Sequence, residues 1–157
     1  MPVVTAIQFT QDQMRTLTGV SAETVRHWRK TIPYLATKTG KAARFSFADL
    51  VGLAVTRELV NSLGVHIGTV SVGVDALFRL LSNSTAPILE GGIALITPTE
   101  ASLRESANWS IGTAAEPTLA IALAPLISRL QQHLLPVAPL PSQATLPFRP
   151  EAVRGRA

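Results

Sequence analysis

The chain has 157 residues, of which 46% are hydrophobic, and its formal net charge is +4. This length allows one domain of ordinary size or two small ones, with enough apolar side chains for a packed core. Because the sequence contains no cysteine, disulfides, thiolate metal sites and a cysteine nucleophile are excluded.

The positive charge is concentrated in the N-terminal third of the chain. Residues 1–50 hold seven Lys and Arg against three Asp and Glu, whereas residues 51–135 hold four against six. A basic segment of this kind indicates a polyanionic partner, and we expect double-stranded DNA. The first residues lack the basic start of a secretion signal, and no apolar stretch is long enough to span a membrane. We therefore expect a cytoplasmic, nucleoid-associated protein with no membrane contact.

Two short helices are predicted first, on either side of Gly19. Their residues are 11–18 and 22–30, and each follows a hydroxyl side chain suited to an N-cap. In the second helix Val25 and Trp28 share one face, three residues apart, which leaves the polar side chains free to meet a partner. Two short helices joined by a glycine turn are typical of a helix-turn-helix.

A basic segment over 36–45 follows this pair. Pro33 ends the second helix, because proline offers no N–H and disfavours helical geometry in the residue before it. We expect a two-stranded ribbon, or wing, with Gly40 at the tip of its hairpin. Three cations stand close to this tip: Lys38, Lys41 and Arg44. A basic tip of this kind suits phosphates or a minor groove.

Two longer helices are predicted next, over 47–63 and 67–81. Ser46 and Asp49 resemble a capping box at the start of the first, and Gly64 ends it. The second carries an apolar stripe at helical spacing, made of Val70, Val74, Leu77 and Leu81. It also contains two glycines, each of which weakens a helix by roughly 1 kcal/mol relative to alanine, so this helix depends on packing.

The turn-rich segment 82–87 marks a domain boundary, and residues 86–135 are expected to form a small α+β module. Its predicted elements are a hairpin turned at Gly91 and Gly92, helical turns over 99–105, a strand over 118–123 and a helix from Pro125 to Leu135. So small a unit buries too little surface to be stable alone. We therefore expect it to pack on the helix over 67–81 or on a second copy of itself. Residues 136–157 are rich in proline and are predicted to be a disordered tail.

The segments VSAETVRHW, IPYL and RFSFADL, in this order, resemble the DNA-binding domain of the MerR family of winged helix-turn-helix transcription regulators. The resemblance covers residues 9–81 and departs from the family pattern at His27, Trp28 and Phe45. The fold expected is mainly α with small β content, in which a MerR-like winged helix-turn-helix precedes the α+β module and the tail. The family pattern implies a homodimer, but no heptad run follows Leu81, so we expect dimerisation through residues 86–135.

The resemblance also implies a docking surface. The recognition helix, 21–30, would enter the major groove, and the wing, 36–45, would lie on the backbone or minor groove. The family's arginine that matches Arg26 contacts DNA; an ion pair with Glu23 is the alternative role for this side chain. Glu23 can instead accept from a cytosine N4, and Ser21 can serve as a cap, a phosphate contact or both. The expected DNA contacts are Ser21, Glu23, Thr24, Arg26, His27, Arg29, Lys30, Lys38, Lys41 and Arg44.

These patterns predict a sequence-specific DNA-binding transcription regulator that acts as a homodimer and contacts RNA polymerase. Two alternatives remain open: an excisionase-like or phage or plasmid architectural factor, and a protein-interaction adaptor that has kept the winged-helix fold. A small apolar effector between the sheet and helix of the module is a further possibility, although core packing accounts better for the Leu and Ile residues there. The three histidines are widely separated, and no nucleophilic arrangement or phosphate loop is present. We expect no metal, no cofactor and no enzymatic activity.

Overall fold

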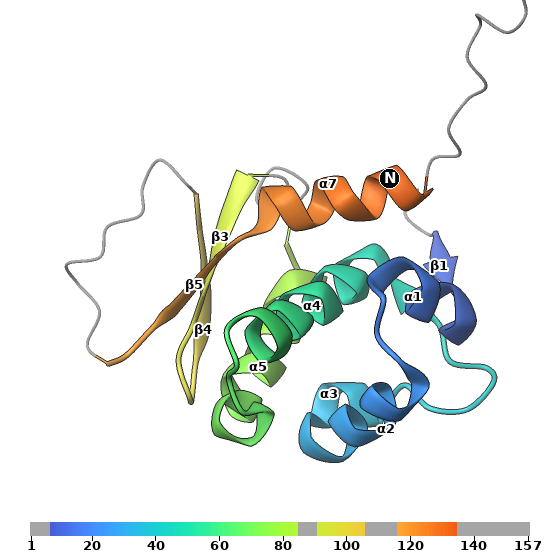
Figure 1. Ribbon diagram of the computed structural model, residues 1–157, viewed down its shortest axis with the longest axis horizontal. Helices are drawn as coiled ribbons and strands as arrows, with labels where there is room; N and C mark the ends of the chain where they lie inside the picture. The colour runs from blue at the N-terminus through green and yellow to red at the C-terminus, as the bar shows by residue number, and fades with distance from the viewer. Residues whose placement is uncertain (1–6, 85–90, 106–115, 135–157) are drawn as a thin grey trace, which may run out of the picture.

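The computed structural model describes residues 7–84, 91–105 and 116–134. Helices dominate these residues, with one two-stranded and one three-stranded antiparallel sheet (Figure 1), so the mainly α fold with small β content is confirmed. The elements are β1 (Gln8–Phe9), α1 (Gln11–Thr18), α2 (Ala22–Thr31), α3 (Pro33–Ala36), β2 (Phe45–Ser46), α4 (Phe47–Arg57), the π-helical turn η2 (Glu58–Ser62), α5 (Ile67–Ser82), β3 (Gly92–Ile96), β4 (Ala101–Glu105), β5 (Leu119–Ala122) and α7 (Leu123–Leu134).

Three helices begin at the hydroxyl caps that the sequence predicts. Thr10 and Ser46 each form a complete capping box at the start of α1 and α4, and the Ser21 side chain accepts from the backbone of α2. These caps satisfy N–H groups that have no partner inside the helix. Gly19 has a φ of 75° and ends α1 in the left-handed region, where glycine meets no steric penalty.

The end of α2 is as predicted, but the short helix after it is not. Ile32 is extended, with φ −112° and ψ 107°, which ends α2. Pro33 then occupies the first turn of α3. Proline suits this position because the first N–H groups of a helix have no partner in any case. The same proline therefore ends one helix and begins another.

The predicted hairpin about Gly40 is wrong. Residues 37–44 contain turns and no strand, and β2 pairs instead with β1, so that Phe45 lies opposite Phe9. Lysine, glycine and alanine are poor strand formers, and they leave this segment without a ladder of its own. Gly40 still makes a turn, with a φ of 86°. We call residues 37–44 the basic loop.

The next two helices follow the prediction closely. The first continues from α4 through η2 and ends before Gly64, whose φ is 67°. The π-helical geometry of η2 is not visible in the sequence pattern. The apolar stripe of α5 is buried at all four predicted positions, Val70, Val74, Leu77 and Leu81.

The C-terminal sheet has the strand order β4–β3–β5. Two predictions for it are wrong: Gly92 begins β3 rather than making a turn, and residues 101–105 form β4 rather than helical turns. The hairpin closes instead at Thr97, whose N–H donates to the carbonyl of Glu100 at 2.9 Å. Pairing with β3 satisfies the backbone groups of β4 that face β3. The strand expected before Gly91 and the tail over 136–157 lie outside the described residues.

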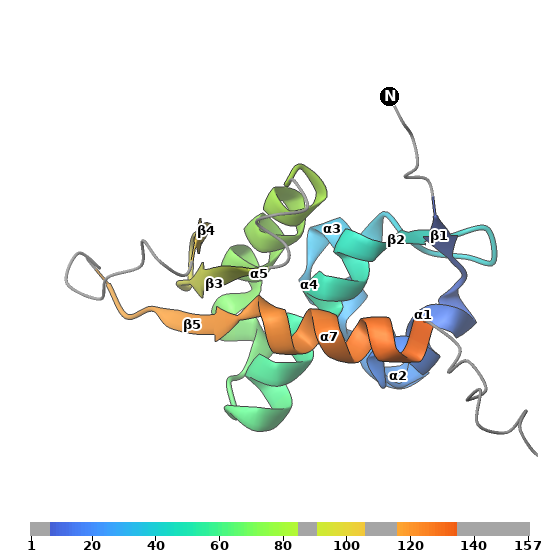
Figure 2. The same cartoon turned by 90° about the horizontal axis from the view of Figure 1, so that it is seen from above.

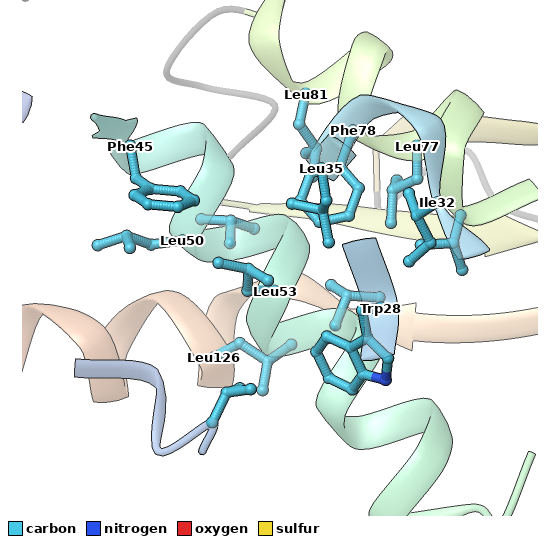
Figure 3. Packing of buried hydrophobic residues seen from close by; sticks show 14 of the residues in the cluster. Trp28, Ile32, Leu35, Phe45, Leu50, Leu53, Leu77, Phe78, Leu81 and Leu126 are labelled. Atoms are coloured by element: carbon cyan, nitrogen blue, oxygen red, sulfur yellow. The ribbon is translucent and has the colours of Figure 1, made fainter. Parts of the chain in front are cut away.

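The helix α7 joins this sheet to the N-terminal helices. It runs along α4 and reaches α1 (Figures 1 and 2), while β3 and β4 pack on α5. Its buried side chains, Leu123, Leu126, Ile127 and Leu130, belong to the same apolar cluster as Trp28, Leu53 and Phe78 (Figure 3). The described residues thus share one core, and the sheet packs on α5 as the size of the module required.

Gly73 is the tightest point between α5 and the C-terminal sheet. A Cβ there would overlap the backbone carbonyl oxygen of Thr97 and lie 3.0 Å from that of Glu100. We expect Gly73→Ala to lower the free energy of unfolding by about 2 kcal/mol or more, because backbone on both sides must move. Chemical denaturation with urea measures this change.

Gly68→Ala is the matched control on the same helix. A Cβ at Gly68 meets only the flexible His66 ring, at 3.6 Å. Alanine is the better helix former, so this variant should be as stable as the parent or more stable, by up to about 1 kcal/mol. Equal changes in the free energy of unfolding for the two variants would contradict the close approach of backbone at Gly73.

Candidate nucleic-acid interface

One face of α2 is polar and exposed along its whole length. Glu23, Arg26, His27 and Lys30 occupy positions i, i+3, i+4 and i+7 and are all exposed. Side chains at this spacing lie one above another on a helix. The opposite face carries Val25 and Trp28, which are buried, as the spacing predicted. The helix therefore offers a single continuous polar surface.

The Arg26 guanidinium is not used by the fold. The ion pairs among the described residues join Arg15 to Asp12, Lys38 to Asp49, Arg79 to Asp75 and Arg129 to Glu58. The alternative pairing of Arg26 with Glu23 is not formed. Both side chains remain available to a partner.

Arg29 has a structural task between α2, α1 and the basic loop. Its Nη2 donates to Oε1 of Gln11 at 2.6 Å, and its Nε donates to the carbonyl of Lys38 at 3.0 Å. Burial lowers the pKa of Arg29, although an arginine stays charged in proteins. Arg29 thus fixes the start of the basic loop beside α2.

Lys38 also points inward. Its Nζ lies 3.1 Å from Oδ2 of Asp49 and donates to the carbonyl of Arg44 at 3.0 Å. The same ammonium is 5.8 Å from the ring centroids of Tyr34 and Phe45, within reach of a cation–π attraction. Lys38 therefore closes the basic loop over the start of α4.

Asp49 is the acceptor on which these contacts meet. Its side chain is 1% exposed. Oδ2 accepts from the backbone N–H of Ser46 at 2.9 Å and Oδ1 from the hydroxyl of Tyr34 at 2.6 Å. With the ion pair from Lys38, both carboxylate oxygens have strong donors, which is the condition for a stable buried charge.

Tyr34 connects this cluster to α5. Its ring stacks on Phe78 with centroids 5.1 Å apart, and its backbone N–H donates to Oδ1 of Asp75 at 2.7 Å. Burial, followed by the hydrogen bond to Asp49, raises the pKa of the Tyr34 hydroxyl well above its ordinary value. The proton accordingly stays on the tyrosine, where it donates to the carboxylate.

The remaining cations of the basic loop face outward. Lys41 and Arg44 are exposed. Nη1 of Arg44 donates to the carbonyls of Lys41 and Ala43, at 3.2 and 3.0 Å. A guanidinium has five N–H donors, so these bonds orient the Arg44 side chain and leave donors for a phosphate.

Ser21 and Thr24 serve the start of α2. The Ser21 hydroxyl accepts from the Thr24 backbone N–H at 3.1 Å and donates to its Oγ1 at 2.9 Å. The cap role of Ser21 is confirmed. Ser21 is exposed and Thr24 is half-buried.

Several residues that hold α2 and the basic loop in place were not predicted from the sequence. Tyr34 and Asp75 had no predicted role, and Asp49 was predicted only as a cap. One signal was present for Tyr34, since it is the sole tyrosine of the chain and stands in an apolar segment. Gln11 and Asp75 look like ordinary surface residues, because their partners are distant in the sequence.

The described ranges hold no group of three or more His, Asp or Glu side chains placed to share a metal ion. Within the same ranges, no helix combines the length and apolar character that a membrane span requires.

Comparison with known proteins identifies one relationship. Residues 9–75 match the family described as the MerR HTH family regulatory protein. No curated protein and no solved structure matches the chain. The matched residues include α1, α2, the basic loop and α4, together with most of α5.

Removing the Tyr34 hydroxyl tests the buried cluster. We expect Tyr34→Phe to lower the free energy of unfolding at pH 7 by about 1.5–3 kcal/mol, because a hydrogen bond to a charged acceptor is lost. The raised pKa of the Tyr34 hydroxyl also predicts how the free energy of unfolding changes with pH. Above about pH 10 the unfolded tyrosine ionises while the folded one keeps its proton, so the stability of the parent falls as pH rises.

The difference in the free energy of unfolding between the parent and Tyr34→Phe should therefore become smaller above pH 10. Urea denaturation at a series of pH values measures it. Thr39→Ala, in the exposed part of the same loop, is the control and should change little at any pH. A difference that stays constant or widens above pH 10 would rule out the raised pKa.

Proposed function

Residues 9–75 are a MerR-family helix-turn-helix domain, and on that premise we propose that the protein regulates transcription by sequence-specific binding to double-stranded DNA. Proteins of this family are DNA-binding transcription regulators and not enzymes. The observation that carries the proposal is the continuous exposed face of α2, formed by Glu23, Arg26, His27 and Lys30. A helix with one polar face and a buried opposite face is the element that a helix-turn-helix places in the major groove.

Within this face Arg26 is the principal base contact. It is exposed, lies at the centre of the face and has no ion-pair partner among the described residues. An arginine can bond a guanine through two donors, which is the commonest specific contact. Glu23, His27 and Lys30 contact neighbouring base edges or phosphates, and Ser21 and Thr24 lie at the end of the helix nearest the backbone.

The basic loop contacts the phosphate backbone or the minor groove through Lys41 and Arg44. Both are exposed, and Arg29 holds the start of the loop against α2. Arg29 and Lys38 contribute mainly by positioning, since their charged groups are bonded within the fold. With Arg26 on a base, the exposed Lys30, Lys41 and Arg44 would give a dimer six phosphate contacts, and a slope of log K against log salt of about −5.

A homodimer through residues 86–135 completes the proposal, because two recognition helices can then read two half-sites. Strand side chains alternate between faces. In β3 the residues Gly92, Ala94 and Ile96 are buried on the face toward α5, so Ile93 and Leu95 lie on the other face. The same face holds the exposed Ala120 and Ala122 of β5, which pair with them. A second copy would cover this apolar surface.

Three further expectations stay with the proposal. The chain divides into a DNA-binding domain over 9–81 and a module over 86–135. It contacts RNA polymerase and is located at the nucleoid. The adaptor alternative is disfavoured, because an adaptor has no need of an exposed basic face beside a basic loop. An architectural factor with the same docking surface would differ in binding without a defined sequence.

We expect Arg26→Ala to weaken binding to a site recovered by genome-wide occupancy by about 5- to 150-fold, and to reduce discrimination against a scrambled duplex. Lys41→Ala should weaken both duplexes about equally and lower the steepness of the salt slope by about one per protomer. Fluorescence anisotropy over a salt series measures both effects.

The control is Arg129→Ala, which removes a half-exposed arginine from α7 and, in the absence of added ligand, should leave affinity within about twofold, since electrostatic effects decay over the Debye length. If Arg26→Ala and Lys41→Ala also stayed within twofold, the docking surface would be wrongly assigned. Equal losses on specific and scrambled duplexes for Arg26→Ala would favour the architectural factor.

Substitutions on the outer face of β3 test the dimer. Removing residues 86–157 would strip Leu126, Ile127 and Leu130 from the core, so point substitutions are the better test. Ile93→Glu places a charge on the outer face of β3, across from Arg104, where the fold tolerates it as an opposite-charge pair. We expect this variant to sediment as a monomer at concentrations where the parent is a dimer.

Val72→Glu is the matched control, because Val72 is 59% exposed on α5, away from the sheet face. It should remain dimeric. The opposite pattern, with Val72→Glu monomeric and Ile93→Glu dimeric, would move the interface to α5.

A further inference from the structure

A cleft lies where the end of α1, the end of α4 and the last turns of α7 meet. Its volume is about 170 Å³. Three side chains that can carry positive charge line it, Arg57, Arg129 and His133, and Glu58 is its one acidic lining residue. Figure 2 shows α7 passing over α4 to reach α1, which brings these elements together.

Arg57 is the cation of this cleft that the fold leaves unpaired. It is half-buried, and its guanidinium lies over the turn between α1 and α2, where a Cβ at Gly19 would be 3.6 Å from its Cζ. It forms no ion pair and donates no side-chain hydrogen bond within the described part of the chain. Glu58 is engaged by Arg129, with Oε2 3.5 Å from Nη1. The cleft therefore keeps a net positive charge.

His133 adds a further polar group. Its Nδ1 lies 2.8 Å from the carbonyl oxygen of Arg129. A carbonyl can only accept, so Nδ1 carries the hydrogen of this bond. Nε2 is left without a partner among the described residues and can meet a ligand.

Apolar side chains form part of the remaining lining of the cleft, together with Thr16, Thr18 and Gly19. Leu126 and Leu130 of α7 and Leu17 of α1 line it. A second cavity of about 350 Å³ adjoins it and shares Thr16, Leu17 and His133 with it. The lining of the second cavity combines the apolar Phe9, Leu17 and Leu134 with the polar Asp12, Gln13, Thr16 and His133, and Asp12 is paired with Arg15. Two guanidinium groups beside this row of apolar side chains match an anion with an apolar part.

We propose that this cleft binds a small organic monocarboxylate with an apolar body. The carboxylate lies between the guanidinium groups of Arg57 and Arg129, because arginine forms strong paired hydrogen bonds with carboxylates. The apolar body extends along Leu17 and Leu126 toward the second cavity. Each cavity is at or below the lower end of the range for drug-sized molecules, so the ligand is small.

The position of the cleft gives such a ligand a route to the DNA-binding surface. Residues Thr16 to Gly19, the end of α1 and the turn before α2, form one wall. A ligand that holds α7 against this turn would favour one placement of α2 over others, and so change DNA affinity. This regulatory step rests on the proposed function, whereas binding of the carboxylate does not.

The test uses the full-length protein without DNA and octanoate as the probe. At about ten times its Kd, octanoate should raise the Tm of the parent by about 3–6 °C, and titration calorimetry should give one site per protomer. Arg57→Gln and Arg129→Gln should each weaken octanoate binding at least tenfold. Arg104→Gln, which removes an exposed cation from β4, should bind octanoate as the parent does.

Three outcomes would overturn the site. They are no Tm shift for the parent with octanoate, an equal shift with octan-1-ol, which has no carboxylate, and unchanged octanoate binding in both arginine variants. A Tm shift that inorganic phosphate reproduces would overturn the requirement for an apolar body. Because Arg129 is half exposed, Arg129→Gln keeps the test decisive if Arg57→Gln fails to fold.

A second arm tests regulation separately. Octanoate at saturation should change the Kd of the parent for its DNA site at least fivefold, and this change should disappear in Arg129→Gln. Octanoate binding without any change in DNA affinity would overturn the regulatory step and leave the site standing. Absence of DNA binding altogether would count against the proposed function and not against the cleft.

Discussion

The buried carboxylate of Asp49 is the interaction on which the docking surface depends. A charge 1% exposed is stable only with strong partners on both oxygens. Here they come from three segments: the cap residue Ser46, Tyr34 of α3 and Lys38 of the basic loop. Because loss of any one leaves a buried charge incompletely paired, α3, the loop and the start of α4 hold one another in place. Arg29 then joins the start of this loop to α2 through the carbonyl of Lys38.

The Arg and Lys residues of this surface have two different roles, and the role of each depends on its burial. Arg29 and Lys38 are half-buried, with their charged groups bonded to the fold, whereas Arg26 and Lys41 are exposed. The first pair sets the geometry of the second. A preorganised surface of this kind loses less conformational freedom when it binds. The basic residues of the N-terminal third therefore include some that position the loop and others that stay exposed.

The C-terminal residues complete the core of the helix-turn-helix domain. Leu126, Ile127 and Leu130 of α7 are buried in the same cluster as the side chains of α2 and α4. Gly73 lets the turn at Thr97 approach α5 closely enough for the sheet to pack there. Because the core is shared, a displacement of α7 alters the packing of α1 and of the turn before α2. It is the physical basis for coupling a ligand in the cleft to DNA binding.

The sequence by itself determined the helix ends and the exposed face of α2. Caps such as Ser21 and turns such as Gly64 act within a few residues, and helical spacing alone places Trp28 opposite the polar face. The family resemblance rests on the same local order, and the family match over residues 9–75 confirms it. Only the tertiary structure decided that Lys38 turns inward, that β2 pairs with β1 rather than across Gly40, and that residues 101–105 form a strand. Each of these outcomes depends on a partner outside the segment concerned, which local periodicity cannot identify.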